Sequence, residues 1–98
     1  MAEPRTVIAG VAWFRPAQWQ LLRSLAVDAD TLEQTHKEWE SLARKMVADL
    51  AREGVVARKV DVDVHALHAW CTTQNRPLDA SARAAYAAAH LRDESERA

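Results

Sequence analysis

The order of strand-like and helix-like segments constrains this chain more than any single residue does. Two short segments of apolar and β-branched residues are each followed by two segments of helical character. In chain order, we predict a strand over 6–14, a helix from Pro16, a long helix over 32–53, a strand over 55–62, and helices over 65–73 and 80–91. The prediction is therefore an α+β fold of order β-α-α-β-α-α, in one domain that spans 1–98. We expect residues 1–5 and 93–98 to fray.

The composition argues against several classes of protein. The formal net charge of −1 gives no general attraction to nucleic acid or to an anionic membrane surface. No apolar run approaches the ~20 residues of a membrane-spanning helix, and the first residues lack the pattern of a secretory signal. The single cysteine, Cys71, cannot form an intramolecular disulfide. We therefore expect a cytoplasmic protein that binds neither nucleic acid nor membrane.

The first predicted strand is apolar on both of its faces. Because side chains alternate along a strand, Val7–Phe14 needs cover on both sides, from helices or from a partner. Gly10 either weakens this strand or allows another backbone to come close. In the second strand, Arg58 interrupts the apolar side, which indicates an edge or a partner contact.

A sheet of two strands is marginally stable and has exposed edges. We expect the two strands to lie side by side with the helices on one face of the sheet. Two intervening helices favour an antiparallel pair, but the first helix is short, so the orientation stays open. Pairing edge to edge with a second copy would give a four-stranded sheet and cover the second face of Val7–Phe14. We therefore predict a homodimer.

Short polar residues indicate where the helices begin. Asp30 followed by Glu33 resembles a capping box and predicts the start of the long helix. Either Asp61 or Asp63 is expected to cap the third helix, and Asp79 the last one.

One segment, His65-x-x-His68-x-x-Cys71, has the residue types of a metal site. Neighbours three apart on a helix differ by about 60° around its axis and could share an ion, whereas the outer two differ by about 120°. The ordinary interpretation places His68 and Cys71 on an apolar stripe. Cys71 with His68 could instead act as nucleophile and base, but a position late in a helix raises the pKa of a thiol. We therefore predict no metal, no cofactor and no catalytic residue, and keep these three as weak metal candidates.

Seven aromatic and basic residues are candidates for a ligand-binding cleft. Trp19, Trp39 and Trp70 fall on or beside apolar stripes, which favours the core. Trp70 lies away from the centre of its stripe and is the best candidate for an exposed aromatic. Arg15 and Arg76 each precede a proline at an element boundary, where a helix amino terminus can bind an anion. The full candidate set is Trp13, Arg15, Trp19, Trp39, Trp70, Arg76 and Arg83.

Several segments also resemble a known pattern. They are 11–15 (Val-Ala-Trp-Phe-Arg), Trp19 with Leu22, Glu38-Trp39, 60–63, 69–71 and 76–83. Together they resemble a family of small uncharacterised bacterial proteins of unknown function, over nearly the whole chain. The resemblance implies a compact domain in a bacterial cytoplasm, and it implies no activity, cofactor or catalytic residue.

These observations lead to three candidate functions. We favour a non-enzymatic interaction module that acts through a homodimer surface or an unidentified protein partner, because no catalytic constellation is evident. Such a module would expose an apolar patch around Trp70 or Tyr86. The first alternative is a small protein that binds an anionic ligand in a cleft lined by the Trp and Arg candidates. The second is a small enzyme that uses His68 and Cys71, which requires both side chains to be accessible.

Overall fold

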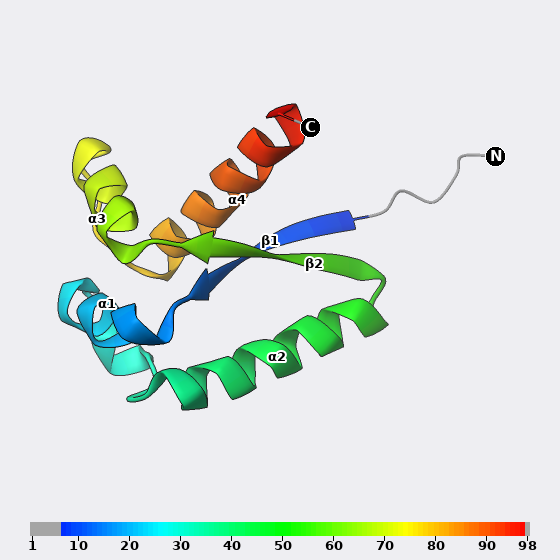
Figure 1. The fold of residues 1–98 in the computed structure, drawn as a ribbon, viewed down its shortest axis with the longest axis horizontal. Coiled ribbons are helices and arrows are strands. Elements are labelled where there is room, and N and C mark those ends of the chain that lie inside the picture. The colour runs from blue at the N-terminus through cyan, green and yellow to red at the C-terminus, as the bar shows by residue number, and fades with distance from the viewer. Residues whose placement is uncertain (1–6, 98) are drawn as a thin grey trace.

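The chain forms a two-stranded sheet that lies between helices (Figure 1). The computed structural model describes residues 7–97, and the predicted fraying of residues 1–5 lies outside this part. In order, the elements are β1 (Val7–Phe14), the 3-10 turn η1 (Pro16–Gln18), α1 (Trp19–Leu25), the 3-10 turn η2 (Ala29–Thr31), α2 (His36–Arg52), β2 (Val55–Val62), α3 (Val64–Thr73) and α4 (Ala80–Arg97). The predicted α+β class and the order β-α-α-β-α-α are confirmed, and α4 continues beyond residue 91.

The two strands run parallel, which settles the orientation that the sequence leaves open and is opposite to what two intervening helices favour. Val7 lies opposite Val55 and Phe14 lies opposite Val62. The physical reason is the length of the two connecting helices. α2 has 17 residues and extends about 25 Å, which matches the length of about 26 Å of an eight-residue strand. α1 has only 7 residues, so α2 returns the chain to the amino end of the sheet.

Helices cover both faces of the sheet, so the expectation that they pack on one face is wrong. On one face, the ring of Trp13 lies 5.0 Å from the ring of Trp39 in α2. On the other face, Gly10 lies against α4, where a β-carbon at position 10 would be 3.1 Å from the carbonyl oxygen of Ala87. Because side chains alternate along a strand, positions 10 and 13 face opposite sides. Figure 1 shows α2 on one side of the strands and α3 and α4 on the other.

The buried core lies at the carboxyl ends of the two strands. It joins β1 and β2 to α1, α3 and the first half of α4. Its buried members are Phe14, Trp19, Leu22, Ala26, Val62, Val64, Leu67, Cys71, Leu78, Ala82 and Tyr86. The amino ends of the strands contribute no residue to this cluster, which leaves the first half of β1 with less cover.

The long helix begins later than predicted, and Thr35 rather than Asp30 caps it. The Thr35 hydroxyl oxygen accepts a hydrogen bond from the Glu38 amide at 3.2 Å, as an N-cap residue does, and the hydroxyl donates to the Glu38 carboxylate at 3.0 Å. The segment before Thr35 is held away from helical geometry by a contact from another element. The indole N–H of Trp19 donates to the carbonyl of Glu33 at 3.1 Å.

The other predicted caps are present. Asp63, rather than Asp61, caps α3 and accepts a hydrogen bond from the His65 amide at 3.1 Å. Asp79 accepts a hydrogen bond from the amide of Ala82 at 2.9 Å at the start of α4. Within residues 7–97, no helix is both long enough and apolar enough to cross a membrane.

We expect Gly10→Val to destabilise the fold, because the new side chain would meet the α4 backbone at Ala87. Overpacking of this kind costs about 1–3 kcal/mol of unfolding free energy, which chemical denaturation would measure. Ala57→Val is the matched control, since Ala57 is a half-buried residue of β2 on the other face of the sheet. Equal stability of the two variants would contradict the close approach of α4 to β1.

Candidate functional site

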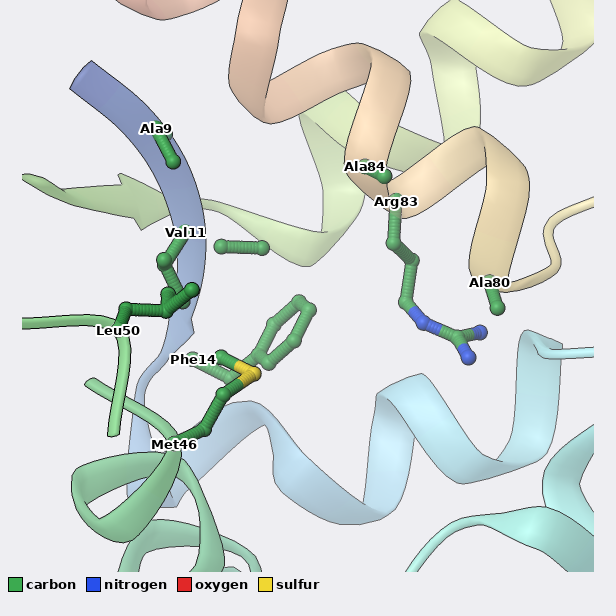
Figure 2. A pocket seen from close by; sticks show the side chains of 10 residues that line it. Ala9, Val11, Phe14, Met46, Leu50, Ala80, Arg83 and Ala84 are labelled. Atoms are coloured by element: carbon green, nitrogen blue, oxygen red, sulfur yellow. The ribbon is translucent and has the colours of Figure 1, made fainter. Parts of the chain in front are cut away.

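A groove runs along the edge of β1 that β2 leaves open (Figure 2). Its volume is about 440 Å³, and α2 and α4 form its two walls. The lining residues are Ala9, Gly10, Val11, Ala12 and Phe14 from β1, Met46 and Leu50 from α2, and Ala80, Arg83 and Ala84 from α4. Consecutive strand residues point to opposite faces of a sheet. A groove lined by four of them in succession therefore opens at the edge of the strand.

The open edge of β1 carries no charge, in contrast to β2. β1 has the sequence Val-Ile-Ala-Gly-Val-Ala-Trp-Phe, whereas β2 contains Arg58, Lys59 and Asp61. Val7 and Ile8 at the amino end of β1 are 56% and 47% exposed. Proteins usually protect an edge strand with charged side chains, proline or a covering loop. β2 is protected by its charged side chains, whereas β1 has none.

Arg83 lies at one end of the groove and is already bound within the protein. Its guanidinium donates two hydrogen bonds to the Asp28 carboxylate, at 2.9 and 2.8 Å. The two side chains are only 11% and 21% exposed. The hydrogen bond from Arg83 lowers the pKa of Asp28, against the opposing effect of burial. The pair ties α4 to the turn that precedes η2, so it acts as a structural link at the groove.

Arg15 forms a second pair of the same chemistry, but on the surface. Its guanidinium donates to the two carboxylate oxygens of Asp61 at 3.1 and 2.7 Å. These side chains are 47% and 68% exposed. The pairing raises the pKa of Arg15 and lowers that of Asp61, in both cases chiefly through the hydrogen bond. The pair joins the carboxyl ends of β1 and β2.

Three of the tryptophans belong to one aromatic cluster. The ring of Trp39 lies 5.0 Å from Trp13, 5.3 Å from Phe14 and 5.4 Å from Trp19. His36 lies beside Trp19 and Trp39, with ring centroids at 6.0 and 5.1 Å. Edge-to-face and stacked contacts at such distances stabilise a fold. These tryptophans attach the start of α2 to the end of β1, which is a structural role.

The expected exposed patch around Trp70 and Tyr86 is not present. Tyr86 is buried, and its ring packs edge to face on Trp70 at 5.5 Å. The guanidinium of Arg76 lies 5.6 Å above the ring of Trp70, which leaves Trp70 half-buried. Tyr86 from α4 and Arg76 from the segment after α3 therefore cover the side of Trp70 that the helical pattern predicts to be exposed.

The candidate ligand-binding residues are thus distributed over several places instead of one cleft. Trp13, Trp19 and Trp39 form the aromatic cluster, and Arg15 lies beside it at the sheet end. Trp70 and Arg76 lie together on α3 and the turn after it. Of the seven, Arg83 alone lines the groove.

The weak metal candidates are not brought together either. Cys71 is buried and its burial raises the pKa of the thiol, whereas His65 and His68 are exposed. Among residues 7–97, no three His, Cys, Asp or Glu side chains are grouped as metal ligands would be. The accessibility that a thiol enzyme requires of Cys71 is therefore missing.

Comparison with known proteins does not suggest a function for the groove. No family model, no curated protein and no solved structure matches this chain. The resemblance to small bacterial proteins stays a prediction from the sequence.

Apart from Arg83, the residues that line the groove were not among the candidates from the sequence. Two signals pointed towards them. The predicted first strand is apolar on both faces and contains no charge, and Met46 and Leu50 continue the apolar stripe of α2 beyond the core. What the sequence could not show is that α4 leaves the edge of β1 open between these walls.

We expect Asp28→Asn to lower the unfolding free energy by about 1.5–3 kcal/mol at pH 7, the usual contribution of hydrogen bonds to a charged group. The folded state holds the pKa of Asp28 below its ordinary value of 3.8. The stabilisation is therefore complete above pH 3.8 and is lost as the pH falls through the folded-state pKa. Denaturant unfolding across this acid range should show a steeper loss of stability for the wild type than for Asp28→Asn.

Asp61→Asn is the matched control, because the same pair chemistry occurs there on the surface. Solvent screens that pair, so the change should cost clearly less. A larger loss for Asp61→Asn than for Asp28→Asn would contradict the assignment of Arg83 and Asp28 as the structural link.

Proposed function

We propose that this protein is a non-enzymatic interaction module that forms a homodimer by pairing the open edge of β1 with the same edge of a second copy. The observation that carries the proposal is the uncharged edge of β1, which is open between an apolar wall from α2 and a wall from α4 whose charged member, Arg83, is already paired with Asp28. The shared sheet would have four strands.

The backbone of β1 supports this proposal first. Each strand of a two-stranded sheet has one neighbour, so alternate backbone N–H and C=O groups of β1 point away from β2. Such an edge is a template for another strand. A second strand would satisfy these groups with main-chain hydrogen bonds, and the groove has room for it beside Ala9, Gly10 and Val11.

Charge supports a second copy as the partner. An edge without charge can pair with itself and bury no unpaired charge, so β1 is compatible with its own copy. The edge of β2 is different, because pairing there would bring the charged side chains of Arg58, Lys59 and Asp61 into the interface. The contrast between the two edges favours β1 as the interface and leaves β2 as the protected outer edge.

Apolar surface around the edge supports the same arrangement. Val7, Ile8 and Met46 are large apolar residues with substantial exposure, and Met46 lines the groove. Covering apolar area contributes about 25 cal/mol per Å². A partner strand paired along β1 would cover Met46 in the groove and would extend over Val7 and Ile8 at the amino end of the strand.

The alternative functions receive less support from the arrangement. Arg15 and Arg83 already bind carboxylates of the protein, so an anionic ligand would have to displace Asp61 or Asp28. The thiol of Cys71 is buried. We therefore keep the interaction module as the function that the geometry supports best.

We expect Ala9→Lys to weaken the dimer by roughly tenfold or more, which corresponds to about 1.4 kcal/mol. The change places a charge in the groove at the proposed interface, where the two copies would bring like charges together. Size-exclusion chromatography with light scattering, over a dilution series, measures the change.

Ala57→Lys is the matched control, because Ala57 lies opposite Ala9 in the sheet and is also half-buried, but belongs to β2. It should leave the dimer intact, and circular dichroism should show both variants folded. A monomeric wild type at micromolar concentration would overturn the proposal, and so would a dimer that both variants weaken equally.

A further inference from the structure

The geometry of the edge points to one arrangement of the two copies, an inference that rests on the proposed function. The two β1 strands run antiparallel about a two-fold axis at Gly10, so that Ala9 lies opposite the partner's Val11. The partner strand occupies the groove between α2 and α4.

The direction follows from the symmetry of hydrogen bonding. Most homodimers are closed by a two-fold axis, which makes the same residues meet on both copies. In a parallel pair, a residue of one strand forms hydrogen bonds with the two residues that flank its neighbour on the other strand. The neighbour itself points its backbone N–H and C=O groups away, so the two opposed residues are not equivalent. A two-fold axis along the strands would place each residue opposite its own copy and make the two equivalent, which conflicts with this hydrogen-bonding pattern. Antiparallel pairing has no such conflict, and it places both copies of α2 on the same face of the four-stranded sheet.

The position of the axis follows from which residues of β1 are free to pair with another strand. At the carboxyl end, the imidazole Nε2 of His36 binds the carbonyl oxygen of Phe14 at 2.7 Å. The next residue, Arg15, leaves the strand and pairs with Asp61. The stretch that remains for pairing is 7–13, and its central residue is Gly10. Gly10 is also one of the four successive residues, Ala9 to Ala12, that line the groove.

The side chains fit this register. Opposite residues have numbers that add to twenty, so Val7 lies opposite the partner's Trp13, and Ile8 opposite the partner's Ala12. Val7 and Ile8 are among the exposed large apolar residues, whereas Trp13 and Ala12 are half-buried. Each exposed side chain thus meets a neighbour that is already supported by the core or by Trp39. The small residues at the centre let the two backbones approach.

Disulfide formation between single-cysteine additions tests the register. Ala9→Cys and Val11→Cys proteins are mixed, allowed to exchange subunits, and oxidised. Directly opposite residues have Cα atoms about 4.5–5.5 Å apart, within the range of about 4.4–6.8 Å for a disulfide. Like positions lie diagonally, about 7–8 Å apart. The mixed 9–11 disulfide should therefore form at least roughly tenfold faster than either like pair, and intact mass spectrometry separates the products. The native Cys71 stays in place because it is buried.

Val7→Cys is the negative control, because two copies of residue 7 would be about 20 Å apart along the strands. A dimer that forms the 7–7 disulfide, or that forms 9–9 and 11–11 as fast as 9–11, would overturn this register and leave the proposed edge pairing standing. A dimer that forms none of these disulfides would also overturn the register, and the Ala9→Lys comparison then decides whether the edge is used. Wild-type protein that is monomeric by light scattering would overturn both.

Discussion

The parallel pairing of β1 and β2 is the constraint on which the rest of the structure depends. Parallel neighbours require a return connection along the sheet, and α2 supplies it on one face. The chain then covers the other face with α3 and α4. β1 contains no charged residue, as suits a strand with helices on both faces, whereas β2 carries Arg58, Lys59 and Asp61. The same lack of charge leaves its outer edge suited to pairing, so the proposed interface is a consequence of how the fold is connected.

Two sets of contacts hold the helices in the positions that shape the groove. The cluster of Trp13, Trp19 and Trp39 fixes the start of α2 against the end of β1. The pair of Arg83 and Asp28 links α4 to the turn after α1. The groove lies between these attachments. Four of the ligand candidates therefore support the walls, namely Trp13, Trp19, Trp39 and Arg83. Apart from Arg83, the lining itself is made of small and apolar side chains.

Much of the fold could be predicted from local patterns, because strand composition, proline and glycine act over a few residues. The strand over 55–62, the cap at Asp79 and the start at Pro16 agree with the structure. The start of α2 could not be predicted, because two capping motifs lie close together and the segment between them is bonded to Trp19, which is distant in the sequence. Strand direction, the cover on Trp70 and the groove depend on which elements meet, and no local pattern contains that information.

The most direct test of the account is amide hydrogen exchange along β1, residue by residue, in the wild-type protein at the concentration used for NMR. In a strand with one neighbour, the amides that point to the open edge exchange quickly and the alternate amides are protected. If the edge of β1 is paired in solution, successive amides from Ile8 to Trp13 should all be protected. An alternating pattern, with every second amide of β1 exchanging as fast as an exposed one, would contradict the account.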